Sequence, residues 1–350
     1  MSVVCYFKEP ANYTLDLKAK VYDDLEIQTR FLSADSLASN SKISSLKQLP
    51  FLAKMKLLWN DCRQFQVIIF NGFYDFELFC LLFFSCLQKN KISIGLESDT
   101  PLKIPANPFK RMLKAGVLTF LFKNKRIYGL AGGNFLHKAL FRHYGMNESK
   151  ILFLPMVIDV ENYLMADSSE NTHFTFLYVG NLYKEKNVRQ LILSFKAVSE
   201  KAVNVQLKIV GTGALLNDLR SEFSRMKNLE FTGALYGKEL RDIYLRSNVF
   251  VFPSLIDNWG LVVNEAMASG LAVISSKFVG ANADLLEGKA TGFIYDPEEK
   301  GDLTKKMLEL YTNKGLYQEY SKNAFDLLHQ NWNYDLYRRQ LLLALDRMEA

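Results

Sequence analysis

The chain has 350 residues and a mass of 40.2 kDa, so two domains of roughly 150–200 residues are expected rather than a single core. Hydrophobic residues make up 49% and charged residues 23%, with only 8 Pro and 19 Gly, which excludes disordered, collagen-like and linker-dominated chains. The net charge of +6 is mildly basic, and its distribution is more informative than its sum.

Strand-like and helix-like segments alternate along the first half. The apolar runs at 3–7, 67–70, 92–95, 127–130 and 151–154 predict strands. The segments near 46–60, 75–88, 107–123 and 134–144 predict helices between them. Such alternation is typical of parallel α/β sheets covered on both faces.

The second half repeats the rhythm more regularly. Strands are predicted at 174–179, 205–210, 229–231, 249–252 and 271–274, and the last stretch, 316–348, has a helical pattern. The polar residues 165–172 predict a linker. We therefore expect two doubly wound, Rossmann-like domains over 1–164 and 173–330 that face a cleft, with a C-terminal helix over 331–350 crossing back to the first domain.

Cysteine and histidine spacing predicts no metal site. The four cysteines form no Cys-x-x-Cys pair and none lies at ligand spacing from a histidine, which favours a reduced, cytoplasmic protein. The histidines His137, His143, His173 and His329 have no partner at ligand spacing, so we expect surface roles for them. The N-terminus lacks the pattern of a signal peptide, and the most apolar run, 78–87, is shorter than the ~20 residues that span a bilayer.

Positive charge is concentrated in one part of the chain. Residues 101–147 contain nine Lys and Arg residues and no Asp or Glu, and aromatic and aliphatic residues are interleaved with them. This composition favours an anionic membrane surface or a phosphorylated acceptor as partner. A solvated basic face is the alternative, and nucleic acid is disfavoured because no recognition motif occurs.

The most specific stretch is residues 253–270, PSLIDNWGLVVNEAMASG, which predicts a loop and a short helix between two strands. Gly260 lies where the helix begins, so that a ligand can approach the backbone, and the free N–H groups of Gly260, Leu261 and Val262 predict an anion site. Asp257 and Glu265 provide a carboxylate on each side. An anion site with a carboxylate on each side suits a nucleotide sugar, which has a diphosphate in the middle, sugar hydroxyls at one end and ribose hydroxyls at the other.

This stretch resembles the signature of retaining GT-B glycosyltransferases, most closely the family 4 group, Glu-x-Phe-Gly-Leu-x-x-x-Glu-Ala-Met-Ala-x-Gly. The spacing of the two acids is kept, with Asp257 at the first acid, Trp259 at the aromatic position and Glu265 at the second acid. The resemblance implies that Asp257 orients the donor sugar, that Glu265 holds the ribose, and that Asn258 and Trp259 belong to the donor site. An ordinary loop and helix of an α/β sheet is the alternative.

Flanking segments extend the resemblance over the second half. Residues 179–187 resemble the family's Val-Gly-Arg-Leu-x-x-x-Lys-Gly, which places Gly180 and Lys186 in the donor site, with Lys186 neutralising the diphosphate. Asn181 stands at the family's Arg and Asn187 at its Gly. Either one cation holds the diphosphate, or Lys184 or a residue elsewhere substitutes. An exposed lysine at a helix start is the alternative for Lys186.

Three further donor contacts and two acceptor-side candidates follow from the resemblance. Gly211 and Gly213 match a turn beside the nucleotide, and Tyr236 lies in the loop expected near the base. Glu97 and Asp99, predicted to follow the strand at 92–95, resemble an acidic-Ser motif of some branches. They are candidates for contacting the acceptor hydroxyl or the reacting sugar. A helix or turn cap is the alternative.

The resemblance implies a retaining, metal-independent glycosyltransferase without a cofactor, with UDP- or GDP-sugar as donor. Residues 1–164 would bind the acceptor and 173–330 the sugar nucleotide. A lipid-linked glycan at the inner face of the cytoplasmic membrane is the expected acceptor, as in surface-polysaccharide assembly. A transferase for a soluble small molecule and a degenerate GT-B protein that binds sugar nucleotide without turnover are the alternatives; an epimerase is disfavoured by residues 253–270.

Overall fold

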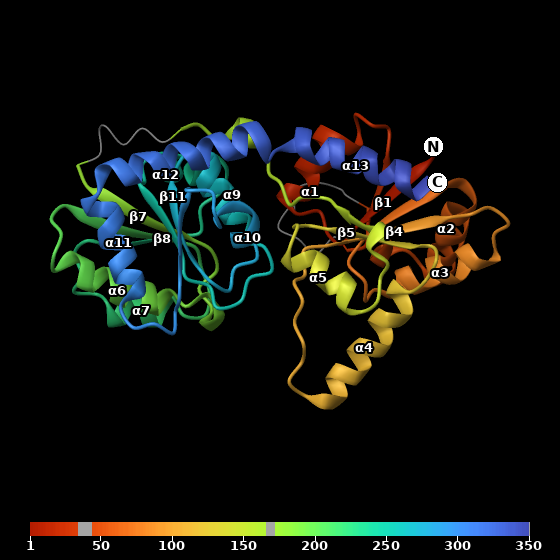
Figure 1. Ribbon diagram of the computed structural model, residues 1–350, viewed down its shortest axis with the longest axis horizontal. Coiled ribbons are helices and arrows are strands. Elements are labelled where there is room, and N and C mark those ends of the chain that lie inside the picture. Colours follow the sequence, from red (N-terminus) through yellow and green to blue (C-terminus); the bar gives the residue numbers. More distant parts are fainter. Residues whose placement is uncertain (34–43, 166–171, 350) are drawn as a thin grey trace. The chain divides into compact units, whose positions relative to one another are not determined.

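The computed structural model describes residues 1–33, 44–165 and 172–349. Contacts divide the chain into unit 1 (Met1–Asp159 and Tyr334–Ala350) and unit 2 (Val160–Asn333). Each unit holds a six-stranded parallel sheet with helices on both faces (Figure 1). The prediction of two doubly wound α/β sheets is therefore confirmed. Residues 166–171 of the expected linker lie outside the described residues.

Unit 1 has the strand order β2-β1-β3-β4-β5-β6. One face of its sheet shares a single apolar cluster with helices α2, α3, α4 and α5. Helices α1 and α13 cover the other face (Figure 1). The strands are β1 (Val3–Phe7), β2 (Gln28–Phe31), β3 (Val67–Asn71), β4 (Ser93–Ser98), β5 (Ile127–Ala131) and β6 (Ile151–Phe153). The helices are α1 (Asn12–Leu17), α2 (Phe51–Gln64), α3 (Phe76–Leu87), α4 (Pro108–Phe122), α5 (Leu136–His143) and α13 (Tyr334–Glu349), with short turns η1 (Lys18–Tyr22), η2 (Leu46–Gln48) and η3 (Glu148–Lys150).

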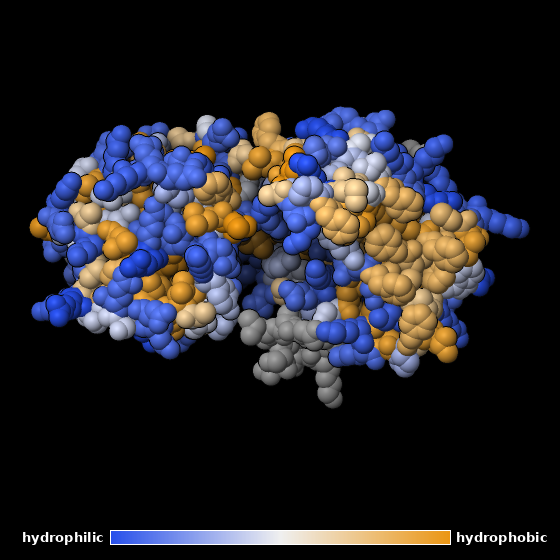
Figure 2. Space-filling model, turned by 90° about the horizontal axis from the view of Figure 1, so that it is seen from below, coloured by the Kyte–Doolittle hydropathy of each residue, from blue (hydrophilic) through white to orange (hydrophobic). Residues whose placement is uncertain are grey.

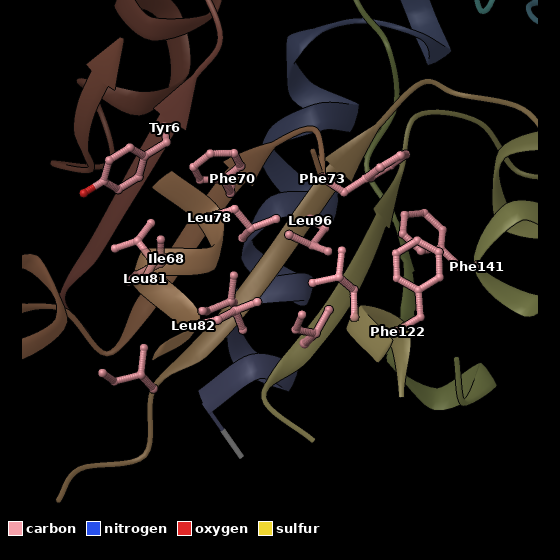
Figure 3. Packing of buried hydrophobic residues seen from close by; sticks show 14 of the residues in the cluster. Tyr6, Ile68, Phe70, Phe73, Leu78, Leu81, Leu82, Leu96, Phe122 and Phe141 are labelled. Carbon is pink, nitrogen blue, oxygen red and sulfur yellow. The ribbon is translucent and has the colours of Figure 1, made fainter. Parts of the chain in front are cut away.

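The core of unit 1 is rich in leucine and phenylalanine. Leu78 and Leu82 of α3 point towards the sheet, where Leu96 of β4 belongs to the same buried cluster (Figure 3). Phe122 of α4 and Phe141 of α5 pack with ring centroids 4.9 Å apart, so the last turn of α4 is anchored to its neighbour.

Unit 2 has the strand order β12-β11-β10-β7-β8-β9. Read from its first strand, β7, this is the Rossmann order, in which the direction of chain progression reverses between β7 and β10. The strands are β7 (Phe174–Val179), β8 (Val205–Val210), β9 (Leu229–Gly233), β10 (Val249–Phe252), β11 (Ala272–Ser276) and β12 (Gly292–Tyr295). The helices are α6 (Val188–Ser199), α7 (Leu216–Glu222), α8 (Gly237–Leu245), α9 (Leu261–Ala268), α10 (Asn282–Leu285), α11 (Asp302–Thr312) and α12 (Lys314–Asp326), with short turns η4 (Val160–Asn162), η5 (Lys184–Lys186) and η6 (Leu327–Asn331).

Three features differ from the sequence prediction. The edge strands β2 and β12 were not predicted, because each is a four-residue segment without the long apolar run of the central strands. The strand predicted at 92–95 continues to Ser98, so Glu97 lies within β4 rather than after it. The predicted C-terminal helical stretch is interrupted near Trp332, and its last part, α13, packs on β3, β4 and β6 of unit 1.

Candidate functional site

The loops that carry the main sequence motifs meet at the switch point of unit 2. Strands β7 and β10 are hydrogen-bonded neighbours, so their carboxyl ends lie side by side. The loop after β7 ends in η5, and the Leu255 N–H in the loop after β10 donates to the Glu185 carbonyl at 2.8 Å. In doubly wound sheets, ligands bind at this kind of position.

Lys186 and Asp257, separated by 71 positions in the chain, form an ion pair there. The Lys186 Nζ lies 2.7 Å from Asp257 Oδ2, and the two side chains are only 20% and 17% exposed. The same Nζ lies 5.6 Å from the centre of the Phe252 ring, which adds a cation–π contact. A lysine ammonium has three N–H donors, so Lys186 retains two for an anion beside the pair.

Asn187 links η5 to helix α6 and occupies the position where the family motif has glycine. Its φ is +56°, in the left-handed region. Asparagine tolerates that region better than other residues with a side chain beyond Cβ, so the substitution keeps the backbone geometry. This turn sets the position of Lys186, its immediate neighbour.

Helix α9 begins at Gly260 as the motif predicts. Gly260 has a φ of +92°, and a Cβ there would lie 3.1 Å from the Phe252 ring and 3.2 Å from Val279. The Val263 N–H donates to the Gly260 carbonyl at 2.8 Å. The N–H groups of Leu261 and Val262 belong to the first turn, which has no intrahelical acceptor, so they and the helix dipole suit an anion.

Glu265 projects from the same helix and contacts a residue that the sequence did not indicate. The hydroxyl of Tyr244, from α8, donates to Glu265 Oε2 at 2.9 Å. Burial raises the pKa of Glu265 to about 7, and the hydrogen bond from Tyr244 opposes that rise. The carboxyl group is therefore poised between its ionised and protonated forms near neutral pH.

Trp259, predicted to belong to the donor site, has a buried side chain. Its side chain is 1% exposed, its Nε1 donates to Asn264 Oδ1 at 2.8 Å, and its ring stacks on Trp332 with centroids 5.8 Å apart. The side chain is thus enclosed by protein, and the predicted membership of Trp259 in the donor site stays a prediction. Trp259 fixes the loop between Asp257 and Gly260.

Gly211 and Gly213 lie directly against the backbone of the loop after β7, where a side chain would not fit. A Cβ on Gly211 would lie 1.9 Å from the Gly180 carbonyl oxygen, and one on Gly213 would lie 2.6 Å from the Leu182 carbonyl oxygen. The loops after β7 and β8 therefore pack directly against each other. These glycines allow the two loops to pack closely, and their contact with a nucleotide stays a prediction.

The remaining predicted donor contacts lie on the surface of unit 2. Asn181 and Tyr236 are exposed, and Asn258 is half-buried. Tyr236 directly precedes α8, the helix that carries Tyr244, the partner of Glu265. The structure thus places Tyr236 on the loop that the sequence predicted, and its contact with a base stays a prediction.

In unit 1, Glu97 is enclosed while Asp99 is half-buried after β4. The Tyr337 hydroxyl of α13 donates to Glu97 Oε1 at 3.4 Å, and Tyr337 also shares a 2.7 Å hydrogen bond with Tyr22. Glu97 Oε2 is buried without a hydrogen-bond partner. Burial, with the nearby Asp99 charge, raises the pKa of Glu97 to about 7. The side chain of Glu97 thus lies under α13, and its contact with an acceptor or the reacting sugar stays a prediction.

The surface assignment of the histidines is wrong for one of them. His137 of α5 is fully buried, whereas His143 and His173 are exposed. His329 is half-buried, and its Nε2 lies 2.9 Å from the Ala268 carbonyl at the end of α9. Within the described residues, no group of three or more His, Cys, Asp or Glu side chains is placed to hold a metal ion.

A family model matches nearly half of the chain, including this site, and curated relatives match parts of the chain. Residues 162–326 match the family described as "Glycosyl transferases group 1". Sulfoquinovosyl transferase SQD2 of Arabidopsis thaliana is 36% identical over 138 residues, which cover 38% of this chain and 26% of that protein. The capsular polysaccharide biosynthesis glycosyltransferase CapM of Staphylococcus aureus is 31% identical over 160 residues, covering 44% of this chain and 41% of that protein.

Solved structures match nearly the whole chain. HepE of Anabaena, in complex with UDP and glucose, superposes with a TM-score of 0.74 over 99% of both chains at 15% identity. WaaG, a glycosyltransferase involved in lipopolysaccharide biosynthesis, gives a TM-score of 0.70 over 98% of both chains at 13% identity. The chain has the GT-B fold. At these identities the likeness shows the fold alone.

Together these comparisons define the class of the C-terminal unit. Residues 162–326 match a glycosyltransferase family model, in agreement with the resemblance seen in the sequence. The aligned part spans 26% of the length of the plant relative and 41% of the staphylococcal one. We therefore propose the reaction, substrates and partners of the whole chain on the basis of the site geometry.

Proposed function

We propose that the chain is a retaining, metal-independent glycosyltransferase that moves a sugar from a UDP- or GDP-sugar to a lipid-linked glycan during surface-polysaccharide biosynthesis. The observation that carries the proposal is the convergence of Lys186, Asp257 and the start of α9 at the switch point of unit 2, with Glu265 on the same helix. A cation, N–H groups of the first helical turn and two carboxylates provide partners for the sugar, the diphosphate and the ribose of a nucleotide sugar.

Each group has a distinct role in this reaction. Lys186 and the N–H groups of Leu261 and Val262 would stabilise the negative charge that grows on the diphosphate as its bond to the sugar breaks. Asp257 would accept hydrogen bonds from the sugar hydroxyls and Glu265 from the ribose hydroxyls. The acceptor oxygen would bond to the same face of the sugar that the diphosphate leaves, and the departing phosphate would take the acceptor's proton.

Relatives support the choice of substrates. HepE has been solved with UDP-glucose, and a relative from Escherichia coli is named UDP-Gal:alpha-D-GlcNAc-diphosphoundecaprenol alpha-1,3-galactosyltransferase. That relative is 27% identical over 198 residues, which cover 53% of this chain and 51% of that protein. Unit 1 would bind the acceptor, at the cytoplasmic side of a membrane. No helix in the described ranges is long and apolar enough to cross a bilayer.

The first experiment is a screen of UDP- and GDP-sugars by thermal shift, because a bound donor stabilises the folded chain. The stabilising donor is then offered with lipid-linked acceptors, with and without EDTA, and the anomeric configuration of the product is read by NMR. We expect transfer with retention that EDTA leaves unchanged. Inversion, or loss of transfer in EDTA, would contradict those parts of the proposal.

Two variants test the site itself. Lys186→Gln and Glu265→Gln should each lower transfer by about 10- to 100-fold, because each removes a charge-assisted hydrogen bond of roughly 1.5–3 kcal/mol. Lys196→Gln, at an exposed position of α6, is the matched control and should transfer normally. If both site variants matched the control, the site would be misassigned. Donor binding by the wild type without transfer to any acceptor would favour a binding protein.

A further inference from the structure

Helix α3 of unit 1 is apolar on its outer side as well as its inner side. Its only charged residue, Glu77, is paired with Lys54 of α2 at 2.9 Å, and its only other polar residue, Ser85, is buried. Leu78, Leu81 and Leu82 fill the core, yet Phe76, Phe83 and Leu87 are exposed on the opposite side. A helix that is apolar all round is expected to have an apolar partner on every side.

Helix α4 continues this apolar surface in a helical stripe. Phe109, Met112 and Phe120 are 68%, 65% and 66% exposed, and Leu113 lies beside them. Their spacing puts them on one face of the helix. The second half of the helix is anchored, through the buried side chains of Leu118, Leu121 and Phe122, and the first turns extend away from the rest of unit 1 (Figure 1). The Asn107 side chain caps the N-terminus by accepting from the Lys110 N–H at 3.0 Å.

These exposed side chains belong to one layer. Helices α2, α3 and α4 contribute to the same buried cluster on one face of the sheet, so their outer sides face the same way. Phe51 and Leu52 at the start of α2 are exposed too. Figure 2 shows hydrophobic side chains gathered on this side of unit 1, with hydrophilic ones between them. We call this the α2–α4 face; it is defined by Phe51, Leu52, Phe76, Phe83, Leu87, Phe109, Met112, Leu113 and Phe120.

The charges around the α2–α4 face identify its partner. Lys110 is exposed at the edge of the stripe of α4, Arg111 is exposed on the other side of the helix, and residues 101–147 contain no acidic side chain. A second copy of the chain bound symmetrically through this face would bring Lys110 near its counterpart, which is unfavourable. An anionic bilayer accepts phenylalanine and leucine at the level of its acyl chains and holds lysine and arginine at its headgroups.

We propose that the α2–α4 face docks on the surface of an anionic phospholipid bilayer, with the exposed aromatic residues of α3 and α4 inserted and Lys110 of α4 at the headgroups. The inference extends the proposed function, since a lipid-linked acceptor is reached at such a surface. It is tested without sugar donor or acceptor, so failure of docking and failure of sugar transfer are distinguishable.

The experiment is co-sedimentation of the full chain with vesicles of phosphatidylcholine alone or with about one third phosphatidylglycerol. We expect binding to the anionic vesicles that weakens with salt. Lys110→Gln should lower partitioning about fivefold, the equivalent of about 1 kcal/mol. Phe109→Ser/Met112→Ser and Phe83→Ser should each lower it at least about tenfold.

The matched control lies on α6 of unit 2, where Leu193 and Lys196 are exposed one turn apart. Leu193→Ser/Lys196→Gln should bind vesicles like the wild type, and all variants should give wild-type circular dichroism. Equal binding to neutral and anionic vesicles, binding to neither, or unchanged binding by the α3 and α4 variants would overturn the proposal. So would a concentration-dependent dimer, seen by light scattering, that the Phe109→Ser/Met112→Ser variant abolishes without any vesicle binding.

Discussion

Glu265 should make nucleotide binding depend on pH in the neutral range. Its pKa is raised to about 7 by burial, against a typical glutamate value near ~4.3. The ionised carboxylate accepts hydrogen bonds from the ribose hydroxyls more strongly than the protonated form, which carries an O–H on one oxygen. Nucleotide binding should therefore release a proton at low pH and weaken as the pH falls through 7.

The magnitude follows from the fraction of ionised carboxyl groups. With a pKa of about 7, roughly nine tenths of the groups are ionised at pH 8 and about 3% at pH 5.5, so the affinity should fall about 30-fold between the two. That factor corresponds to about 2 kcal/mol of binding free energy. Tyr244→Phe removes the hydrogen bond that lowers this pKa, so the midpoint should move to higher pH.

Isothermal titration calorimetry with UDP and GDP across this pH range measures the effect. The matched control is Glu265→Gln, which should bind about 10- to 100-fold more weakly at pH 8 and show only the pH dependence of the nucleotide's own phosphate. The ratio of the wild-type and Glu265→Gln affinities isolates the carboxyl group. A ratio that stays constant from pH 5.5 to 8 would refute the reasoning.

Three further predictions concern stability, measured by thermal unfolding with circular dichroism. Asn187→Gly should change the free energy of unfolding little, whereas Asn187→Val should cost at least about 1–2 kcal/mol, because valine disfavours the positive φ; equal effects would contradict the role assigned to the turn. Trp259→Ala should cost about 3–5 kcal/mol and weaken nucleotide binding, since it empties the space against Trp332; weakened binding without a lower melting temperature would point instead to direct ligand contact. Glu97→Gln should be more stable than the wild type at pH 8, by up to about 3 kcal/mol, and this advantage should shrink towards pH 5. The folded-state pKa of Glu97, about 7, exceeds the unfolded value, so the stability that the protonated wild-type group provides is lost as the pH rises through 7. A difference in stability that does not depend on pH would contradict this prediction.

Central strands were predictable because burial on both faces leaves a continuous apolar run. The runs at Val3–Phe7 and Phe174–Val179 predicted β1 and β7 to the residue. The edge strand β2, with sequence QTRF, carries no such signal, because only Phe31 is buried. Its position depends on pairing with β1, which is a property of the tertiary structure rather than of the local sequence.

The site was predictable where backbone chemistry restricts the residue type. Gly260 must adopt a positive φ under the Phe252 ring, and the spacing from Asp257 to Glu265 reflects one loop followed by one turn of helix. The orientation of side chains was less predictable. Nothing local distinguishes a tryptophan that faces a ligand from one that stacks on Trp332, and nothing near Glu265 in the sequence indicates Tyr244.

The pairing of Lys186 with Asp257 bears on the two departures from the family motif. Asn181 leaves the loop after β7 without the usual arginine, so Lys186 is the cation that the motif supplies beside the start of α9. Paired with Asp257 at 2.7 Å, its ammonium is held in position at the switch point and keeps two N–H donors for phosphate oxygens. Aspartate has a shorter side chain than glutamate, so the carboxylate stays close to its own loop. The backbone of Asp257 is hydrogen-bonded to that of Phe278 and Gly280. Asn181 and Asp257 are therefore compatible with the proposed site, in which Lys186 and the N–H groups of α9 would together contact the diphosphate.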